Sequence, residues 1–578
     1  MILQALCEYY EACAARGSGE IARFGYSDAG VSFALSISWA GELQSVIPLK
    51  EEVQRGKKTA YVSKRMVVPE QATRTVGVMA NFLCDNGGYL LGVDAKGKPE
   101  RTRRCFEAAK KLHLSLLEEL EDPAAQAICA FFRSWNPDTA QENPALTDCM
   151  DEITGGALLV FFLPDNRFAQ DIPALQAAWD AHAANEEDAV RMPCLVTGRP
   201  DQPIALIHNK IKGVRDAQAV GATLVGFNAP AYESYGCDKD QGLNAPVSRY
   251  AAFAYTTALN KLLADVKHKK QIGDMTVVYW AKNGEDAYAD VFSLSLDPQQ
   301  SDDDELNSIM GPLSKGEMLD LEAIEPDMPF YILGLSPNAA RISVRLFLRS
   351  TFGEMLKNLA AHYARIDVAR APYEPAYLTP YELLRETTNP KATNPTPAPL
   401  LAGAVLRAIL ENQKYPEELC VAVLLRIRAE LNITRAKAAI LKGYLIKNRE
   451  RDEGEIKMAL NESCTDRAYV LGRLFAVLEK AQMDANPGIN TTIKDRYFAS
   501  ACATPAAVFP TLLKLSRSHI AKAEYGYASE NAIAKLMDLL DARPFPTRLD
   551  LEEESMFYLG YYHQVQTRYQ KKNTEEEK

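Results

Sequence analysis

A stretch rich in proline, threonine and asparagine at residues 389–399 divides the chain into two parts with different patterns. Its sequence, NPKATNPTPAP, carries one charged residue and has the composition of a linker. Before it, short apolar runs alternate with helices and turns. After it, the apolar residues recur with helical period. The chain is therefore predicted to be an α+β protein, with a mixed α/β N-terminal region followed by an α-helical bundle.

This division predicts four parts. We expect an N-terminal basic domain over residues 1–150, a mixed α/β domain over 151–388, the linker over 389–399, and a helical bundle over 400–578. A hairpin is predicted over 31–47, and buried strands over 157–163 and 329–334. The expected helical blocks of the bundle begin at Leu400, Pro416, Thr434, Ala468, Pro505 and Ser529.

Composition excludes several classes of protein. The 578 residues are 47% hydrophobic and 24% charged, as in soluble globular proteins. The longest apolar run, 157–163, is far shorter than the ~20 residues of a membrane helix, and the N-terminus does not have the pattern of a signal peptide. A cytoplasmic protein without a membrane partner is expected. The eleven cysteines form no CxxC pair and the seven histidines do not cluster, so we expect neither a metal nor another cofactor.

The positive charge is concentrated near the N-terminus. From Lys50 to Lys111 there are fourteen Lys and Arg residues against seven Asp and Glu, in a chain of net charge -11. Such a patch is typical of a contact with phosphate, although a solvated surface explains the charge equally well. The predicted contacts with the phosphates of a nucleic-acid backbone are Lys57, Lys58, Lys64 and Arg65. The polar candidates for reading base edges, on turns rich in glycine and asparagine, are Arg74, Asn81, Gln241 and Asn244.

Two further basic stretches are candidates for backbone contact. In the alternating run 342–349, the period of two is expected to place Arg341, Arg345 and Arg349 on one face of a strand, together with Ser343. From Val421 to Arg451 there are eight basic residues against two acidic ones. The candidates in this second stretch are Arg426, Arg428, Arg435 and Lys437.

A nucleotide-dependent enzyme is an alternative. Residues 92–99, GVDAKGKP, have the glycine and lysine spacing of a phosphate-binding P-loop, but Pro99 lacks the hydroxyl that would bind Mg²⁺, and no strong helix is predicted there. The acidic segment 297–327 has ten Asp and Glu residues, which can hold Mg²⁺, but a solvated loop is the better explanation because no helix or strand is predicted to fix the carboxylates.

Several motifs, in this order along nearly the whole chain, resemble a known family. They are MILQAL at the N-terminus, RTVG and NFLCDN at 74–86, FNAPAYESYG at 227–236, QGLNAPVS at 241–248, GLSPNAAR at 334–341, YLTP at 377–380, KDRYF at 494–498 and LGYYHQ at 559–564. In these motifs the chain is similar to the large subunit of the type I-C CRISPR Cascade complex.

The resemblance implies a subunit without catalytic activity in an RNA-guided surveillance complex. Such a subunit would recognise the protospacer-adjacent motif (PAM) in double-stranded target DNA, assist duplex opening, and contact the displaced strand. The implied protein partners are the subunits that carry the guide RNA, a small helical subunit and a separate helicase-nuclease. A purely architectural subunit without DNA contact is the second alternative.

The resemblance also implies that the small helical subunit is translated from within the same gene. Met458 follows Glu453, Gly454 and Glu455, whose codons can spell a purine-rich ribosome-binding sequence. The product would comprise residues 458–578, a bundle of the size of a small domain. Its expected contacts with the displaced strand are Arg467, Arg473, Lys494, Arg496, Lys514 and Arg517.

Overall fold

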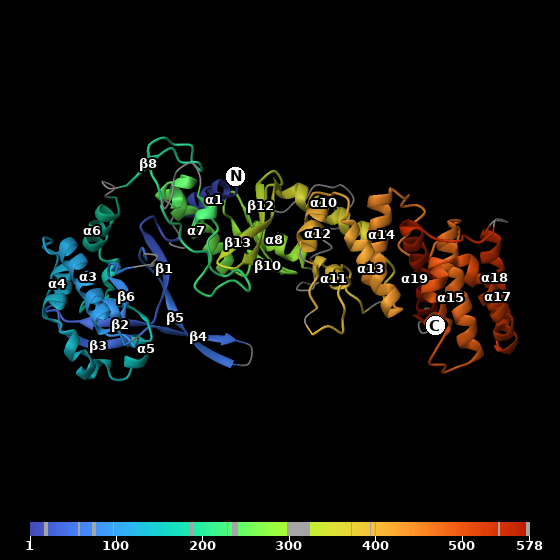
Figure 1. The fold of residues 1–578 in the computed structure, drawn as a ribbon, viewed down its shortest axis with the longest axis horizontal. Helices are drawn as coiled ribbons and strands as arrows, with labels where there is room; N and C mark the ends of the chain where they lie inside the picture. Colours follow the sequence, from blue (N-terminus) through green and yellow to red (C-terminus); the bar gives the residue numbers. More distant parts are fainter. Residues whose placement is uncertain are drawn as a thin grey trace. The chain divides into compact units, whose positions relative to one another are not determined.

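The computed structural model forms two compact units. It describes the whole chain except residues 17–20, 56–57, 72–76, 96, 185–188, 228, 234–240, 298–323, 372, 394, 399, 541–543 and 574–578. Unit 1 comprises Met1–Gly213 and Gln218–Lys261, and unit 2 comprises Val214–Ala217 and Leu262–Lys578. Unit 1 is mixed α/β, and unit 2 joins a sheet to a series of helices (Figure 1). The predicted fold class is therefore confirmed.

The described residues of unit 1 form three sheets. Its strands are β1 (Tyr26–Val31), β2 (Phe33–Ile37), β3 (Leu43–Pro48), β4 (Lys50–Arg55), β5 (Lys58–Pro69), β6 (Cys84–Asn86), β7 (Leu158–Phe162), β8 (Arg191–Met192) and β9 (Gln202–Pro203). Its α-helices are α1 (Ile2–Ala15), α2 (Gly87–Leu90), α3 (Pro99–Leu117), α4 (Pro123–Ser134), α5 (Met150–Thr154), α6 (Pro173–Ala184) and α7 (Arg249–Ala264). Short 3₁₀ turns include η5 (Gln241–Asn244).

The central sheet of unit 1 has the order β3-β2-β7-β6. Strand β7 is the predicted buried strand, and it pairs in parallel with β2. Because successive side chains on a strand point to opposite faces, Leu159 and Phe161 pack with residues of α3 and α4, whereas Val160 packs toward β1 and β5. Both faces of the sheet are thus covered. The predicted hairpin at 31–47 is confirmed as the antiparallel pair β2 and β3.

Strands β1, β5 and β4 form a separate sheet that carries the basic segment. The second half of β5 pairs with β1, from Lys64 to Pro69, and its first half pairs with β4 alone. Figure 1 shows the β4 and β5 hairpin extending beyond β1. A two-stranded ribbon is stable only when another element supports it, and β1 supplies this support at one end.

Unit 2 begins with an antiparallel sheet of order β10-β11-β12-β13. Its strands are β10 (Lys269–Ile272), β11 (Met275–Ala281), β12 (Pro329–Asn338) and β13 (Arg341–Thr351). The helices are α8 (Asp286–Leu296), α10 (Phe352–Ile366), α11 (Pro380–Arg385), α12 (Leu401–Leu410), α13 (Glu417–Glu430), α14 (Arg435–Arg449), α15 (Arg467–Ala485), α16 (Ile493–Ala503), α17 (Pro505–Lys522), α18 (Gly526–Leu539) and α19 (Leu551–Asn573).

One hydrophobic core runs through unit 2 on both sides of the proline-rich stretch. Val277 and Tyr279 of the sheet belong to the same cluster as Val405 of α12 and Leu424 of α13. Helix α12 contacts both β13 and α10. The compact units therefore divide the chain at a different place from the predicted parts, because apolar side chains before and after residues 389–399 bury one another.

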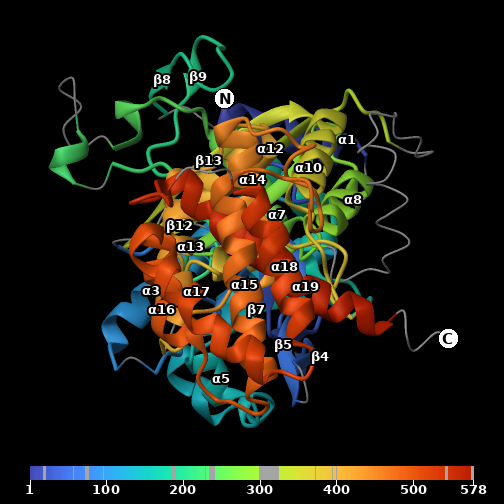
Figure 2. The ribbon, with the colours of Figure 1, turned by 90° about the vertical axis from the view of Figure 1, so that its right-hand side faces the viewer.

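The last five helices form a bundle around α15. Helix α15 contacts α16, α17, α18 and α19, and Figure 2 shows it among them. Its side chains are almost all buried, from Ala468 to Ala481. Every predicted helical block is present within two or three residues, but α16 and α19 were not among the predicted blocks.

All ten cysteines within the described ranges are buried and free of disulfides. No helix in these ranges combines the length and apolar character required to cross a membrane.

Candidate nucleic-acid interface

Among the cations of the β1-β5-β4 sheet whose side chains the structure describes, Lys64 and Arg65 are exposed. Adjacent strand residues point to opposite faces, so the two side chains do not share a face. The Arg65 guanidinium is 64% exposed and forms an ion pair with Asp28 of β1. The Lys64 ammonium is exposed and has no hydrogen bond or ion pair with any other described residue. Lys57 and the side chain of Lys58 lie outside the described residues.

Asn81 lies in a buried turn and is 4% exposed. Its backbone N–H donates to the Asp85 carboxylate (2.9 Å), and its carboxamide donates to Gln71 Oε1 (2.7 Å). Leu83 follows with a positive φ of 57°, and its N–H donates to Nε2 of the buried His113 (2.9 Å). Burial lowers the pKa of His113 to about 4, which keeps the ring neutral and able to accept this bond. The Asn81 carboxamide is therefore engaged inside the protein.

Gln241 and Asn244 form the two ends of η5. The Asn244 carboxamide donates to the Gln241 carbonyl oxygen (3.0 Å), and both residues are half-buried. Gly242 between them is required, because a Cβ at this position would overlap the Ala205 carbonyl oxygen. The turn thus holds both side chains near the surface of unit 1. Arg74, the fourth candidate for base reading, lies outside the described residues.

The arginines of β13 do not share one face, contrary to the sequence prediction. Arg349 pairs with Tyr331 and Arg341 pairs with Asn338, seven positions apart on β12, so the two arginines lie on opposite faces. The cause is a register shift opposite Gly334 and Leu335, where β13 has one extra residue. Arg345 is exposed at this bulge. Ser343 lies on the face of Arg341, so the expected row of three arginines does not exist.

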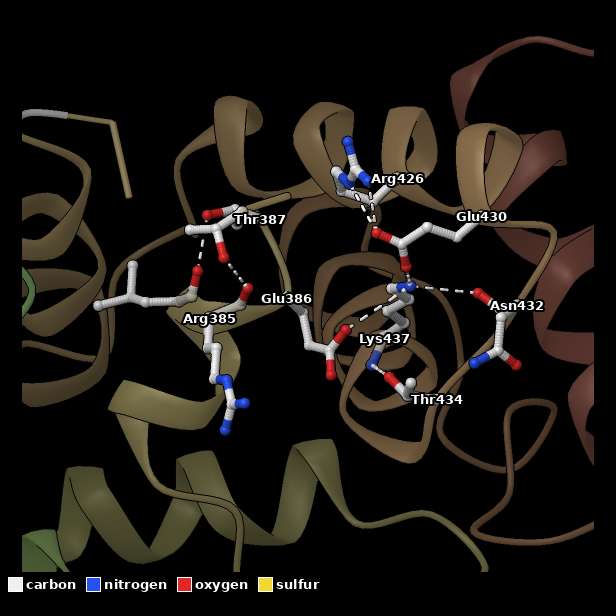
Figure 3. A network of polar contacts seen from close by, with 10 residues as sticks. Arg385, Glu386, Thr387, Arg426, Glu430, Asn432, Thr434 and Lys437 are labelled. Atoms are coloured by element: carbon white, nitrogen blue, oxygen red, sulfur yellow. Dashed lines mark hydrogen bonds and ion pairs between the residues drawn. The ribbon is translucent and has the colours of Figure 1, made fainter. Parts of the chain in front are cut away.

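The four candidates of the second basic stretch have partners inside unit 2. Arg426 donates to Glu430 (2.6 and 2.8 Å), and the buried ammonium of Lys437 forms an ion pair with the same carboxylate (Figure 3). Burial opposes the ionisation of Glu430, but the hydrogen bonds from Lys437 and Arg426 hold its pKa below the usual value. Arg428 forms an ion pair with Glu554 of α19.

Arg435, the fourth candidate, is 7% exposed and donates to the carbonyl oxygens of Pro375 (2.5 Å) and Ala376 (2.8 Å). The sequence counted these four charges as a surface stripe, whereas the fold places their partners next to them. Their contact with DNA stays a prediction, and the geometry favours a structural role.

Three of the other four cations of this stretch also have partners inside unit 2. The buried Lys442 donates to the Asp367 carbonyl oxygen (2.5 Å), and Arg449 forms an ion pair with Glu417 (3.3 Å). Arg451 forms ion pairs with Glu552, Asp466 and Glu455. Lys447 is different: its half-buried ammonium has no hydrogen bond or ion pair within the described part of the chain.

The resemblance of residues 92–99 to a P-loop is only partial in the structure. A helix of 19 residues, α3, does begin at Pro99, so the prediction that no strong helix starts there was wrong. However, the element before this segment is the short helix α2, whereas a P-loop follows a strand. Nearly all of the acidic segment 297–327 lies outside the described residues.

The chain thus consists of a mixed α/β unit and a unit that joins a sheet to a series of helices, and both carry exposed cations. Among the residues with described positions, no group of three or more His, Cys, Asp and Glu side chains is placed to hold a metal ion. The chain belongs to the family described as CRISPR-associated protein (Cas_Csd1), which matches residues 6–569. Membership in this family confirms the resemblance to the large subunit of Cascade. No curated protein matches the chain.

Proposed function

We propose that this protein is the non-catalytic large subunit of a type I-C Cascade complex. In this role it recognises the PAM in double-stranded DNA, assists duplex opening and R-loop formation, and helps to recruit the helicase-nuclease in the cytoplasm. Its partners are the subunits that carry the guide RNA and a small helical subunit. In RNA-guided complexes the protein reads a short motif and backbone shape, while base pairing reads the target sequence.

The observation that carries this proposal is the exposed Lys64 on β5, next to Arg65. Together with family membership, an ammonium without a described partner favours contact with an external phosphate. If the protein were a nucleotide-dependent enzyme, the purified protein would bind ATP specifically. If it were an architectural subunit, its affinity for DNA would be absent or insensitive to salt. Either result would exclude the proposed role.

Changing Lys64 to Gln should weaken duplex binding equally with and without a PAM. The slope of log affinity against log salt should fall by about 0.9, the value for one phosphate contact. Arg65→Gln should have a smaller effect because Asp28 already balances Arg65. Asp28→Asn should strengthen binding, since it frees the guanidinium. The measurement is fluorescence anisotropy with labelled duplexes over a series of salt concentrations.

Arg103→Gln is the matched control for this set. Arg103 is an equally exposed arginine of unit 1 with an ion pair to Asp138, and it lies on α3, which is not part of the β1-β5-β4 sheet. We expect it to leave the affinity unchanged. If Lys64→Gln and Arg103→Gln behave alike, the proposed contact on β5 is wrong.

Changing Gln241 or Asn244 to Ala should weaken binding only to targets with a PAM. A good pair with a base edge contributes ~1–3 kcal/mol, and the same range is expected for Arg74→Ala. Asn81→Ala serves as the comparison: it removes a buried carboxamide and leaves Gln71 Oε1 without this donor, so we expect a loss of stability of ~1–3 kcal/mol. Equal losses on PAM and non-PAM targets would contradict base reading at η5.

A further inference from the structure

A cationic groove lies in unit 2, where α14 ends and the chain passes from α12 to α13. It has a volume of about 600 Å³. Lys414, Lys447 and Arg451 line it, together with Glu450 and Glu453. Three cations line the groove. Lys447 and Arg451 belong to the basic stretch 421–451 that the sequence singled out, and Lys414 lies in the loop before α13.

Lys447 is held among other positive charges. Burial lowers the pKa of Lys447, and the charges of Arg365 and Lys414 lower it further. No carboxylate lies within ion-pair distance of its ammonium among the residues that the structure describes. A half-buried cation without a counter-ion costs free energy in the free protein.

The neighbouring Arg365 of α10 is fixed in place by neutral partners. Its guanidinium donates to Asn412 Oδ1 (2.9 Å) and to the Tyr415 hydroxyl (3.1 Å). Both acceptors orient the guanidinium without neutralising it, and no ion pair of Arg365 is formed in the described ranges. Lys414 donates to Glu450 (3.1 Å) and to the Asn448 carbonyl oxygen (3.3 Å).

The acidic residues of the groove neutralise these positive charges only in part. Glu450 is 78% exposed and is paired with Lys414. Glu453 lines the groove but has no ion pair with a cation in the described part of the chain. Arg451 also lines the groove, and its positive charge is balanced by ion pairs with Glu552, Asp466 and Glu455. Lys447 and Arg365 are therefore the cations here without an ion pair among the described residues, and because Glu453 offsets one of their two charges, a net charge of about +1 remains to attract an external anion.

We propose that this groove binds a backbone phosphodiester of a single strand of nucleic acid through Lys447, with Arg365 and Lys414 beside it. A strand fits better than a small phosphate ligand because the groove is open and lined by long side chains, whereas free phosphate is usually held by converging backbone N–H groups. This inference takes only one element from the proposed function, namely that the ligand is a nucleic acid. The displaced DNA strand and the guide RNA have the same backbone chemistry.

The test uses the full-length protein and two labelled probes, a 20-nucleotide oligo-dT and a 20-nucleotide oligo-rU. Lys447→Gln should weaken binding of at least one probe by about 10-fold or more, as expected for one charge-assisted hydrogen bond. The salt slope should fall by about 0.7, the single-strand value for one phosphate. The affected probe identifies the source of the strand. Unchanged binding of both probes overturns the inference.

Thermal melting separates a ligand site from a structural lysine. Lys447→Gln removes the repulsion from Arg365 and Lys414, so the melting temperature should stay the same or rise while strand affinity falls. A lower melting temperature would show that Lys447 stabilises the fold and would overturn the inference. Lys357→Gln is the control, because Lys357 is an exposed lysine of α10 that does not line the groove.

Two further comparisons complete the design. Replacing part of the chloride by inorganic phosphate at equal ionic strength should leave strand binding intact, and displacement by millimolar phosphate would instead indicate a small-anion site. If Lys64→Gln leaves duplex binding intact while Lys447→Gln weakens strand binding, the groove stands and the proposed contact on β5 fails. If Lys64→Gln weakens duplex binding while Lys447→Gln leaves strand binding intact, the groove proposal is refuted and the contact on β5 is supported.

Discussion

Replacing Gly472 or Gly560 by Ala should destabilise the C-terminal bundle by about 1–3 kcal/mol or more, the usual cost of overpacking. Gly472 of α15 and Gly560 of α19 lie where the backbones of the two helices approach each other closely. A Cβ on Gly472 would overlap the Phe557 carbonyl oxygen, and a Cβ on Gly560 would overlap the Tyr469 carbonyl oxygen. Because the obstacle is helical backbone, the helices must separate, and the surrounding apolar contacts weaken. Thermal unfolding followed by circular dichroism measures the loss.

Gly403→Ala provides the matched control. Gly403 is also inside a helix, α12, but a Cβ there would meet its nearest neighbour, the Arg345 carbonyl oxygen, at 3.6 Å, which is ordinary contact. Ala favours a helix over Gly by up to ~1 kcal/mol, so this change should be neutral or stabilising. If all three substitutions have the same effect, helix propensity governs the result and the close approach of α15 and α19 does not.

This close approach explains why α19 was not predicted from the sequence. Its central residues, LGYYHQ, include a glycine and three consecutive aromatic side chains, which lowers the expected helix propensity. The helix is stable because Phe557, Tyr558 and Tyr561 are buried against α15 and α16. By contrast, blocks such as 435–449 and 467–485 carry the pattern of a buried helix in their own sequence, and their prediction was confirmed.

The charged sites show a similar limit. Counting charges located the basic stretches correctly, but it could not show which charges are balanced, because the partners are distant in sequence. Arg428 and its partner Glu554 are 126 residues apart, and Lys442 and the carbonyl of Asp367 are 75 residues apart. For the same reason the sequence missed Arg365 and Lys414, whose relevance depends on their position beside Lys447 and has no local signal.

The β-strand prediction failed at a single inserted residue. The alternation from Arg341 to Arg349 is regular in the sequence, and it located β13 correctly. The bulge opposite Gly334 and Leu335 reverses the faces of all residues before it. A one-residue shift of this kind depends on the pairing strand, and the sequence of β13 alone does not reveal it.

Silent recoding of Glu453, Gly454 and Glu455 should abolish a short C-terminal product of the gene. The structure gives this prediction a physical basis. Met458 is 51% exposed and lies between α14 and α15, so a product of residues 458–578 begins outside any helix. It contains α15 to α19, and the contacts of α15 with the other four helices are all internal to it. The product has 121 residues and a mass of about 14 kDa.

The basic residues of this product are not equivalent. Arg473 is 6% exposed and donates to the carbonyl oxygens of Asn461 and Glu462, and Lys494 lies against the rings of Phe498 and Tyr561. Arg467 donates to the Pro544 carbonyl oxygen (2.6 Å). The three other cations predicted to contact the displaced strand, all exposed in the structure, are Arg496, Lys514 and Arg517. We expect the small product to bind single strands through these three.

A C-terminal tag on the full-length gene allows both products to be detected on one blot. Recoding with the protein sequence unchanged, and separately Met458→Leu, should each remove the short product and leave the long one. Silent recoding of Lys480, Ala481 and Gln482, which precede the exposed Met483, is the control and should change nothing. Gly472→Ala should also deplete the short product, because its core depends on the same contact between α15 and α19. If the wild-type gene gives no short product, or if both changes at the start leave it intact, Met458 is an ordinary loop residue.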